Sequence, residues 1–307
     1  MSMKKLLMAL TVVFILYNNG FAGNNQVNKT GKPVVSVSIL PQKYFVEQIA
    51  GNFCNINVIL PPGSSPEDYE PAPKQIIEVA NSDIFFYMGH LGFEKSWMKK
   101  IARNAPNVDF ISCSKGIDLL RETCNKEDRE HDADENLAGT DPHIWTSPEN
   151  VKIISRTICS ELSKKYPAEK KVFETNLASF ISKIDTLDVH IRQMFSDSIK
   201  TSFMIFHPSL GYFARDYHLT QYAVEFEGKS PSTAHMKAMV DLARKEKINT
   251  IFIQSQFETA KASAIAREIR ASVVTVDPLA VDWLSEMYSI GEKMKKALAV
   301  PTHEKTN

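Results

Sequence analysis

The chain has 307 residues, and its 36 lysines and arginines balance 36 aspartates and glutamates, so the formal net charge is zero. This balance gives no electrostatic reason to expect a polyanionic partner, and no stripe of basic residues with interleaved aromatics indicates nucleic-acid binding. A chain of this length exceeds a typical single domain, so we expect two lobes, each with its own apolar core.

The first 22 residues have the features of a secretory signal peptide. Lys4 and Lys5 precede an apolar run from Leu6 to Tyr17, and a small-x-small cleavage pattern ends at Ala22. The run is roughly half as long as a membrane span requires, and no second run of that kind follows. We therefore expect an exported, soluble periplasmic protein and, because no cysteine lies at the cleavage site, no lipid anchor.

Eight short β-rich runs alternate with helical segments along the rest of the chain. Near-continuous apolar runs such as VVSVSIL, DIFFY and TIFIQ are typical of parallel strands that are covered on both faces. Four runs precede the middle of the chain and four follow it, at Val34–Leu40, Asn55–Leu60, Asp83–Tyr87, Val108–Cys113, Ser202–Phe206, Gln221–Phe226, Thr250–Ile253 and Ser272–Val276. This pattern predicts an α/β fold of two lobes, each with a four-stranded, mainly parallel sheet flanked by helices.

A long helix is predicted between the two sets of strands. After Pro167, apolar residues recur at spacings of four and three, which indicates one amphipathic helix from Ala168 to about Asp197. At about 1.5 Å per residue it would extend roughly 45 Å, enough to join both lobes as one backbone helix. The expected parts of the chain are a signal peptide at 1–22, an N-terminal lobe at 23–166, the connecting helix at 167–197 and a C-terminal lobe at 198–307.

The segment Arg121–Thr140 is highly charged and has almost no apolar periodicity, which predicts a mobile surface loop.

Four cysteines in an exported chain could form disulfides. Cys113 with Cys124 is the pair to test, while Cys54 and Cys159 lie in apolar surroundings that suit buried thiols.

Polar side chains that can bind a metal ion follow several of the predicted strands. Ligands of parallel α/β sheets gather beyond the carboxyl ends of the strands. Glu67 lies in the loop after the second strand, and His207 and Asp277 directly follow the fifth and the eighth. His143 lies in the segment Asp-Pro-His-Ile-Trp, where Pro142 restricts the residue before it to extended conformations. Two imidazoles and two carboxylates suit a divalent metal ion.

Each of these residues also has an ordinary structural explanation. Glu67 alone fits a solvated loop acid, and a single histidine beside a tryptophan, such as His143, is more often a packed or surface residue. His207 could cap the helix that follows it, and Asp277 before Pro278 fits an N-cap or a turn. Their joint position at strand ends in both lobes favours a common site.

Five segments, in order along the chain, carry a specific resemblance: PPGSSPEDYEPAP, DPHIW, FHPSLGYFARDY, EGKSPSTAH and VDPLA. With them the whole mature chain resembles the metal-binding solute-binding proteins of ABC importers, the ZnuA/TroA-like family (cluster A-I), and most of all its zinc-binding members. The resemblance implies one metal ion in the cleft between two lobes, with two ligands from each lobe. It places Glu67, His143, His207 and Asp277 at the ligand positions.

The residue at position 67 decides which metal the resemblance implies. Glu67 stands where the family usually has histidine, and two histidines with two carboxylates resemble the manganese carriers in composition. Those carriers, however, place the extra carboxylate where this chain has His207. Two neutral imidazoles favour zinc over manganese, and two carboxylates neutralise a divalent ion. We therefore expect Zn²⁺ as the cargo, with Mn²⁺ or Fe²⁺ as alternatives and Asp68 as an alternative oxygen ligand.

The expected function is capture and delivery, not catalysis. Four protein ligands close the coordination shell, whereas a catalytic zinc keeps a position open, and the chain has no HExxH motif and no nucleophile elbow. The resemblance implies a periplasmic monomer that passes zinc to a cognate ABC permease in the inner membrane. The alternatives are a manganese or iron carrier, a secreted metallohydrolase with Glu67 as general base, and a carrier for a small organic solute.

Overall fold

The structure is a computed structural model, and it describes residues 31–121, 139–196, 200–225, 232–256 and 259–299. The chain divides into two compact units, Met1–Lys32 and Pro33–Asn307, and every described helix and strand lies in the second. The predicted signal peptide lies outside the described residues. So does the predicted surface loop, apart from an antiparallel bridge between its ends, Arg121 and Thr140. Within the described ranges, no helix is long and apolar enough to cross a membrane.

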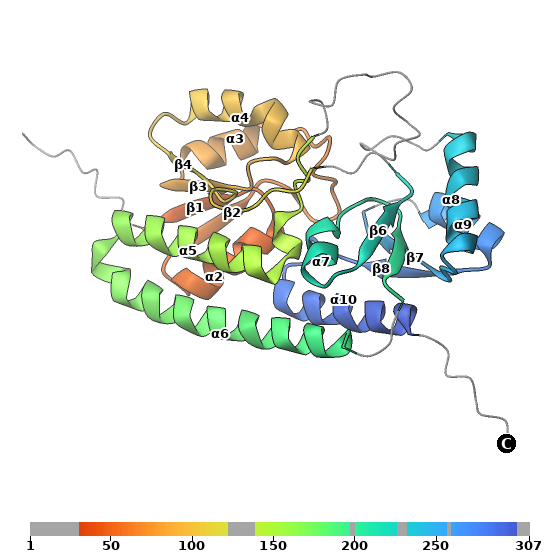
Figure 1. The fold of residues 1–307 in the computed structure, drawn as a ribbon. Coiled ribbons are helices and arrows are strands. Elements are labelled where there is room, and N and C mark those ends of the chain that lie inside the picture. The colour runs from red at the N-terminus through yellow and green to blue at the C-terminus, as the bar shows by residue number, and fades with distance from the viewer. Residues whose placement is uncertain (1–30, 122–138, 197–199, 226–231, 257–258, 300–307) are drawn as a thin grey trace, which may run out of the picture. The chain divides into compact units, whose positions relative to one another are not determined.

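The first four strands form one parallel sheet in the order β2-β1-β3-β4. Helices α3 and α4 lie on one face of this sheet, and α2 lies on the other, where it packs against α5 and α6 (Figure 1). This burial on both faces explains the apolar runs in the sequence. The elements of this N-terminal half are β1 (Val34–Val37), α2 (Leu40–Ala50), β2 (Asn55–Val58), α3 (Pro73–Ala80), β3 (Ile84–Tyr87), α4 (Gly92–Asn104) and β4 (Asp109–Ser112).

The last four strands repeat the arrangement, with the parallel order β6-β5-β7-β8. All eight predicted strands are confirmed, but several end earlier than predicted: β6 stops at Ala223, and the next residue, Val224, is fully buried without belonging to the strand. The backbone N–H groups of Val224 and Glu225 still donate to the carbonyls of Ile205 and Phe206, so hydrogen bonding to the neighbouring chain continues past the end of β6. The elements of this C-terminal half are β5 (Ser202–Ile205), α7 (Gly211–Asp216), β6 (Thr220–Ala223), α8 (Thr233–Lys245), β7 (Thr250–Gln254), α9 (Thr259–Ile269), β8 (Ser272–Val276) and α10 (Trp283–Leu298).

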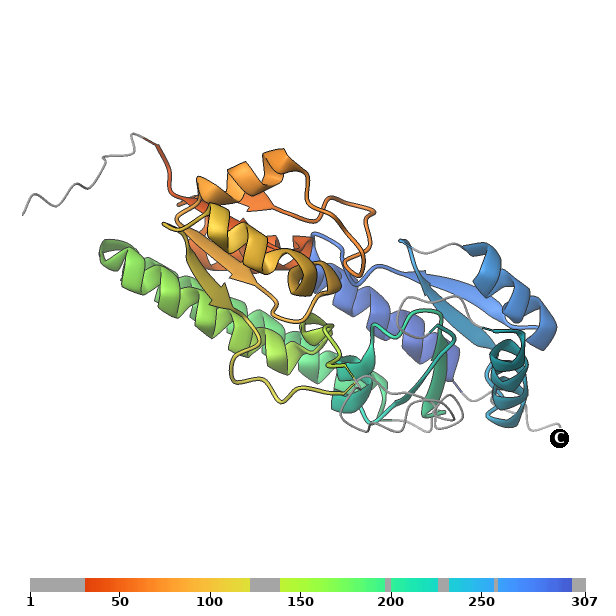
Figure 2. The same ribbon diagram turned by 90° about the horizontal axis from the view of Figure 1, so that it is seen from above.

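The predicted connecting helix is confirmed as the short 3-10 helix η3 (Pro167–Glu169) followed by α6 (Lys170–Met194). Helix α6 packs against α2 and α5 (Pro148–Lys165), and also against α10 of the C-terminal half (Figures 1 and 2). One cluster of buried apolar side chains therefore extends from β1 through α6 to α10. The domain boundaries at residues 166 and 197 stay a prediction.

Cys113 is fully buried at the end of β4 and is a free thiol in the structure. The side-chain amide Nε2 of Gln42 donates to its sulfur at 3.5 Å, and burial raises the pKa of this thiol to about 12. The hypothesised disulfide with Cys124 is therefore not formed at Cys113, and Cys124 itself lies outside the described residues.

Candidate metal centre

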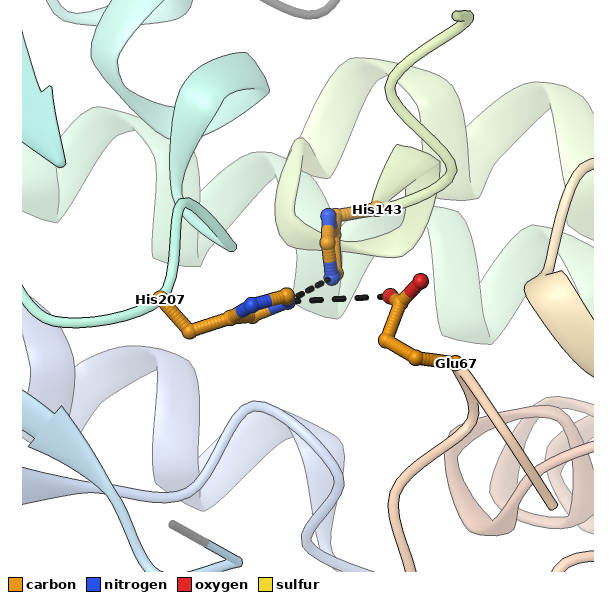
Figure 3. A group of neighbouring side chains, drawn as sticks. All are labelled: Glu67, His143 and His207. Atoms are coloured by element: carbon orange, nitrogen blue, oxygen red, sulfur yellow. Dashed lines mark hydrogen bonds and ion pairs between the residues drawn. The ribbon is translucent and has the colours of Figure 1, made fainter. Parts of the chain in front are cut away.

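Three of the four predicted ligands come together in the structure. One ligand atom from each of Glu67, His143 and His207 lies within 4.8 Å of the others, and the side chains point toward a common centre (Figure 3). The Nε2 atoms of His143 and His207 are 3.3 Å apart, and a carboxylate oxygen of Glu67 lies 3.7 Å from the Nε2 of His207. Both histidines are 5% exposed, so bulk water does not surround them.

The fold explains why residues so far apart in sequence meet. Glu67 lies in the loop between β2 and α3, and His207 lies just beyond β5, so both follow the carboxyl ends of strands in their sheets. His143 directly precedes the 3-10 helix η2 (Ile144–Thr146), which leads into α5. Loops beyond the carboxyl ends of parallel strands are where ligands of α/β proteins bind.

Asp141 fixes the orientation of the His143 ring. Its Oδ1 atom accepts from the backbone N–H of His143 at 2.9 Å and lies 2.8 Å from the ring nitrogen Nδ1. An ionised carboxylate only accepts hydrogen bonds, so Nδ1 carries the proton and the lone pair of Nε2 faces the centre. Gly211 makes room for this acid, because a Cβ atom there would lie 2.5 Å from Oδ2 of Asp141.

Glu225 has the same role for His207. Its Oε2 atom lies 3.2 Å from Nδ1 of His207, and both residues are buried. Gln254 holds the same histidine by its backbone, because its Nε2 donates to the carbonyl of His207 at 3.0 Å. Sequence reasoning missed Glu225 because it placed the residue inside a strand. The available signal was an acid two residues beyond the observed end of β6.

The two supporting carboxylates leave three acceptor groups facing one another. With a proton on Nδ1 of each ring, the Nε2 atoms of His143 and His207 both present lone pairs, and the Glu67 carboxylate adds a third. In this arrangement the three groups can bind one cation together. The residues present therefore fit a cation that accepts nitrogen and oxygen ligands.

The loop that carries Glu67 is bonded to the start of α4. The N–H of Phe93, in the first helical turn where backbone N–H groups lack helical partners, donates to the carbonyl of Pro66 at 3.0 Å. Gly92 touches the backbone of Glu67 so closely that a Cβ atom would lie 2.7 Å from its carbonyl carbon and 2.9 Å from its Cα atom. The position of Glu67 thus depends on a glycine at position 92.

Glu94 holds the turn before α4 in place. Its buried carboxylate accepts from the backbone N–H groups of Met88, Gly89 and Leu91 and from the hydroxyl of Ser38. Burial raises the pKa of this carboxyl, and these four hydrogen bonds oppose the rise. Through Glu94, the start of α4 that holds the loop of Glu67 is therefore bonded to buried residues of the N-terminal half.

Asp277, the fourth predicted ligand, does not join the group of three among the described residues. Its Oδ1 atom accepts from Nε2 of Gln256 at 2.8 Å and from the N–H of Leu279 at 3.2 Å. It lines a cavity of about 180 Å³ beside the pocket that holds His143 and His207, and both Gln256 and Leu279 line the two spaces. The alternative ligand Asp68 is exposed and also lies outside the group.

The chain is similar to a protein family and to individual proteins that are known to bind metals. The model of the family ZnuA, described as zinc-uptake complex component A, periplasmic, matches residues 35–297. The zinc-binding lipoprotein AdcA of Streptococcus pneumoniae is 28% identical over 280 residues, which cover 89% of this chain and 54% of that protein. The chain thus spans about half the length of that relative. The metal ABC transporter substrate-binding lipoprotein ScbA of Streptococcus cristatus is 27% identical over 232 residues, 72% of each chain.

Among solved structures, a zinc-bound deletion mutant of ZnuA has a TM-score of 0.81 and 34% sequence identity. The match covers 88% of this chain and 99% of that one. The family model and this structure both extend over the two sheets and the helix α6 between them. The chain therefore belongs to the ZnuA family, the periplasmic component A of zinc-uptake complexes.

Proposed function

We propose that this protein is the substrate-binding component of a metal ABC importer, which captures Zn²⁺ in the periplasm and delivers it to a membrane permease. The observation that carries the proposal is that Glu67, His143 and His207 each place one ligand atom within 4.8 Å of the others, and that two imidazoles with a carboxylate suit a divalent metal ion. The family description and the names of the relatives support zinc as cargo and an ABC permease as partner. We propose that the carrier acts as a monomer and is exported by its signal peptide.

The proposed coordination shell has four protein ligands. Nε2 of His143, Nε2 of His207 and a carboxylate oxygen of Glu67 bind first, and Asp277 completes the tetrahedron that zinc prefers. To do so, Asp277 exchanges its hydrogen bond from Gln256 for the ion. Gln256 and Leu279 line both cavities, so the space beside Asp277 adjoins the pocket of His143 and His207. This proximity is the basis for proposing the movement.

A closed shell is the reason to propose binding instead of hydrolysis. A catalytic zinc keeps one position for water, with a general base nearby. In the proposed shell both carboxylates, Glu67 and Asp277, are themselves ligands, so neither is left to serve as that base. Zinc-loaded protein that hydrolyses peptide, ester or phosphate substrates, with loss of that activity in Glu67→Gln, would establish the metallohydrolase instead.

Competition between metals tests the proposed cargo. Zinc should displace Mn²⁺ and Fe²⁺ from the wild-type protein at equal concentrations, because intrinsic affinity for imidazole sites rises toward zinc. Glu67→His replaces an oxygen ligand with nitrogen and should widen the preference for zinc over manganese. The matched control is Glu70→His, which makes the same change at an exposed position of the same loop. Manganese that displaces zinc from the wild-type protein would contradict the proposal.

The zinc affinity should fall as the pH falls. A protonated imidazole cannot bind a metal ion, and histidines in general change protonation between about pH 8 and pH 5. Two histidine ligands therefore predict a loss of more than about tenfold in affinity between pH 7.5 and 5. A chelator-buffered zinc titration at each pH measures the slope, and His207→Ala should make it shallower. An affinity that stays constant over this range would argue against two histidine ligands.

A further inference from the structure

The segment Asp141–Ser147, here called the histidine segment, precedes α6 in the sequence but is bonded to the C-terminal half. Two indole groups exchange hydrogen bonds between the segment and the chain around the start of α10. Nε1 of Trp145 donates to the carbonyl of Pro278 at 2.8 Å, and Nε1 of Trp283 donates to the carbonyl of Trp145 at 2.8 Å. Both tryptophans are almost completely buried, so water cannot replace either bond.

Helix α7 holds the two ends of the histidine segment. The hydroxyl of Tyr212 donates to the carbonyl of Asp141 at 2.9 Å, and the same hydroxyl accepts from the N–H of Leu120 at 3.1 Å. At the other end, the hydroxyl of Ser147 donates to the carboxylate of Asp216. The histidine segment also has bonds within its own part of the chain, from the N–H of Asp141 to the carbonyl of Leu120 and from Nδ2 of Asn150 to the carbonyl of Ile144. His143 is thus tied to the half that carries His207 as well as to the chain that leads into α5.

Glu67 is held by other hydrogen bonds and contacts than the histidine segment. The bonds that hold its loop run to Phe93 and to Ser65, both in the N-terminal half, and Gly92 at the start of α4 touches its backbone. Figure 3 therefore shows a histidine pair that is held by one set of contacts and a carboxylate that is held by another.

We infer that Trp283 and Tyr212 are positioning residues for His143: they hold the histidine segment in register with His207, so that the two imidazoles form a preassembled pair. Glu67 joins this pair and is held by contacts of its own. The inference rests on the proposed function, because it assigns the order in which the proposed ligands are organised. A pair that is held at its binding distance before the ion arrives loses less conformational freedom on binding.

Trp283→Phe and Tyr212→Phe test the inference, because each removes one hydrogen bond and keeps an aromatic ring. We expect each variant to bind zinc roughly 10–100-fold more weakly, the usual effect of losing a group that orients a ligand. The matched control is Tyr217→Phe. It also removes a buried tyrosine hydrogen bond, but this bond runs to Asp188 of α6 and not to the histidine segment. It should lower the melting temperature of the metal-free protein and leave the zinc affinity unchanged.

A double-mutant cycle separates positioning from general loss of stability. In a Glu67→Ala background, Trp283→Phe should weaken zinc binding by the same factor as in the wild type. The reason is that Trp283 bonds the histidine segment, whereas Glu67 is held by other contacts. In a His143→Ala background it should have no further effect. The inference is overturned if Trp283→Phe binds zinc like the wild type, or if its effect persists without His143. If His143→Ala itself binds zinc like the wild type, the proposed function fails instead.

Discussion

A His207→Ala variant is expected to bind zinc more weakly than the wild type by more than the roughly 10–100-fold that loss of an orienting partner costs. His207 is the central member of the group, because its Nε2 lies 3.3 Å from that of His143 and 3.7 Å from the Glu67 carboxylate. Removing it leaves three of the four proposed ligands, which no longer enclose the ion. Competition against a chromophoric chelator measures the change.

Two controls make this result specific. His190→Ala removes a half-exposed histidine of α6 that pairs with Glu292, so it should leave zinc affinity unchanged. Glu225→Gln keeps the size of the side chain beside His207 but removes its charge, and should cost roughly 10–100-fold in affinity. A folded His207→Ala protein with wild-type zinc affinity would show that the ion binds elsewhere.

Gly92→Ala is expected to lower both the stability and the zinc affinity of the protein. The new Cβ atom would lie 2.7 Å from the carbonyl carbon of Glu67, and that neighbour is backbone, which cannot rotate away. The loop has to move, which breaks the bond from Phe93 to Pro66 and displaces Glu67. Overpacking of this kind costs about 1–3 kcal/mol of folding free energy, and displacement of a ligand roughly 10–100-fold in zinc affinity.

Gly291→Ala separates the two effects of Gly92→Ala. Its Cβ atom would lie 3.2 Å from Cγ1 of Ile191 and 3.3 Å from Sδ of Met194, where α10 crosses α6. This substitution also crowds the core, but it does so without touching the loop of Glu67. Chemical unfolding of the metal-free proteins measures what crowding alone does at Gly291, and only Gly92→Ala should lose zinc affinity. Equal zinc affinities in the two variants would mean that Glu67 is not held as described.

The eight strands and the long helix could be predicted because each depends on a local pattern. Apolar runs such as Thr250–Ile253 identify strands that are buried on both faces, and the repeat after Pro167 identifies α6. The strand ends were less predictable, since Val224 continues both the apolar pattern and the backbone hydrogen bonding beyond the last residue of β6.

The centre could be predicted only in part, because its remaining contacts join distant segments. The position of His207 directly after a strand placed it at the correct edge of the sheet. No local pattern indicates that Asp277 accepts from Gln256. Nor does one indicate that Trp283 donates to the carbonyl of Trp145, 138 residues away, while Trp145 donates to that of Pro278. Such contacts depend on how two separately encoded loops meet.

The contacts that hold Glu67 are separate from those that hold the histidine pair, so the loop between β2 and α3 can change without disturbing the pair. The loop's bonds to Phe93 and Ser65 are made by backbone and hydroxyl groups, and none uses the side chain at position 67. An exchange of glutamate for histidine there alters the chemical character of the binding shell while the histidine pair and its supports stay as they are. Evolution can therefore retune the choice of cargo in this fold by a single codon change or by recombination of one short segment.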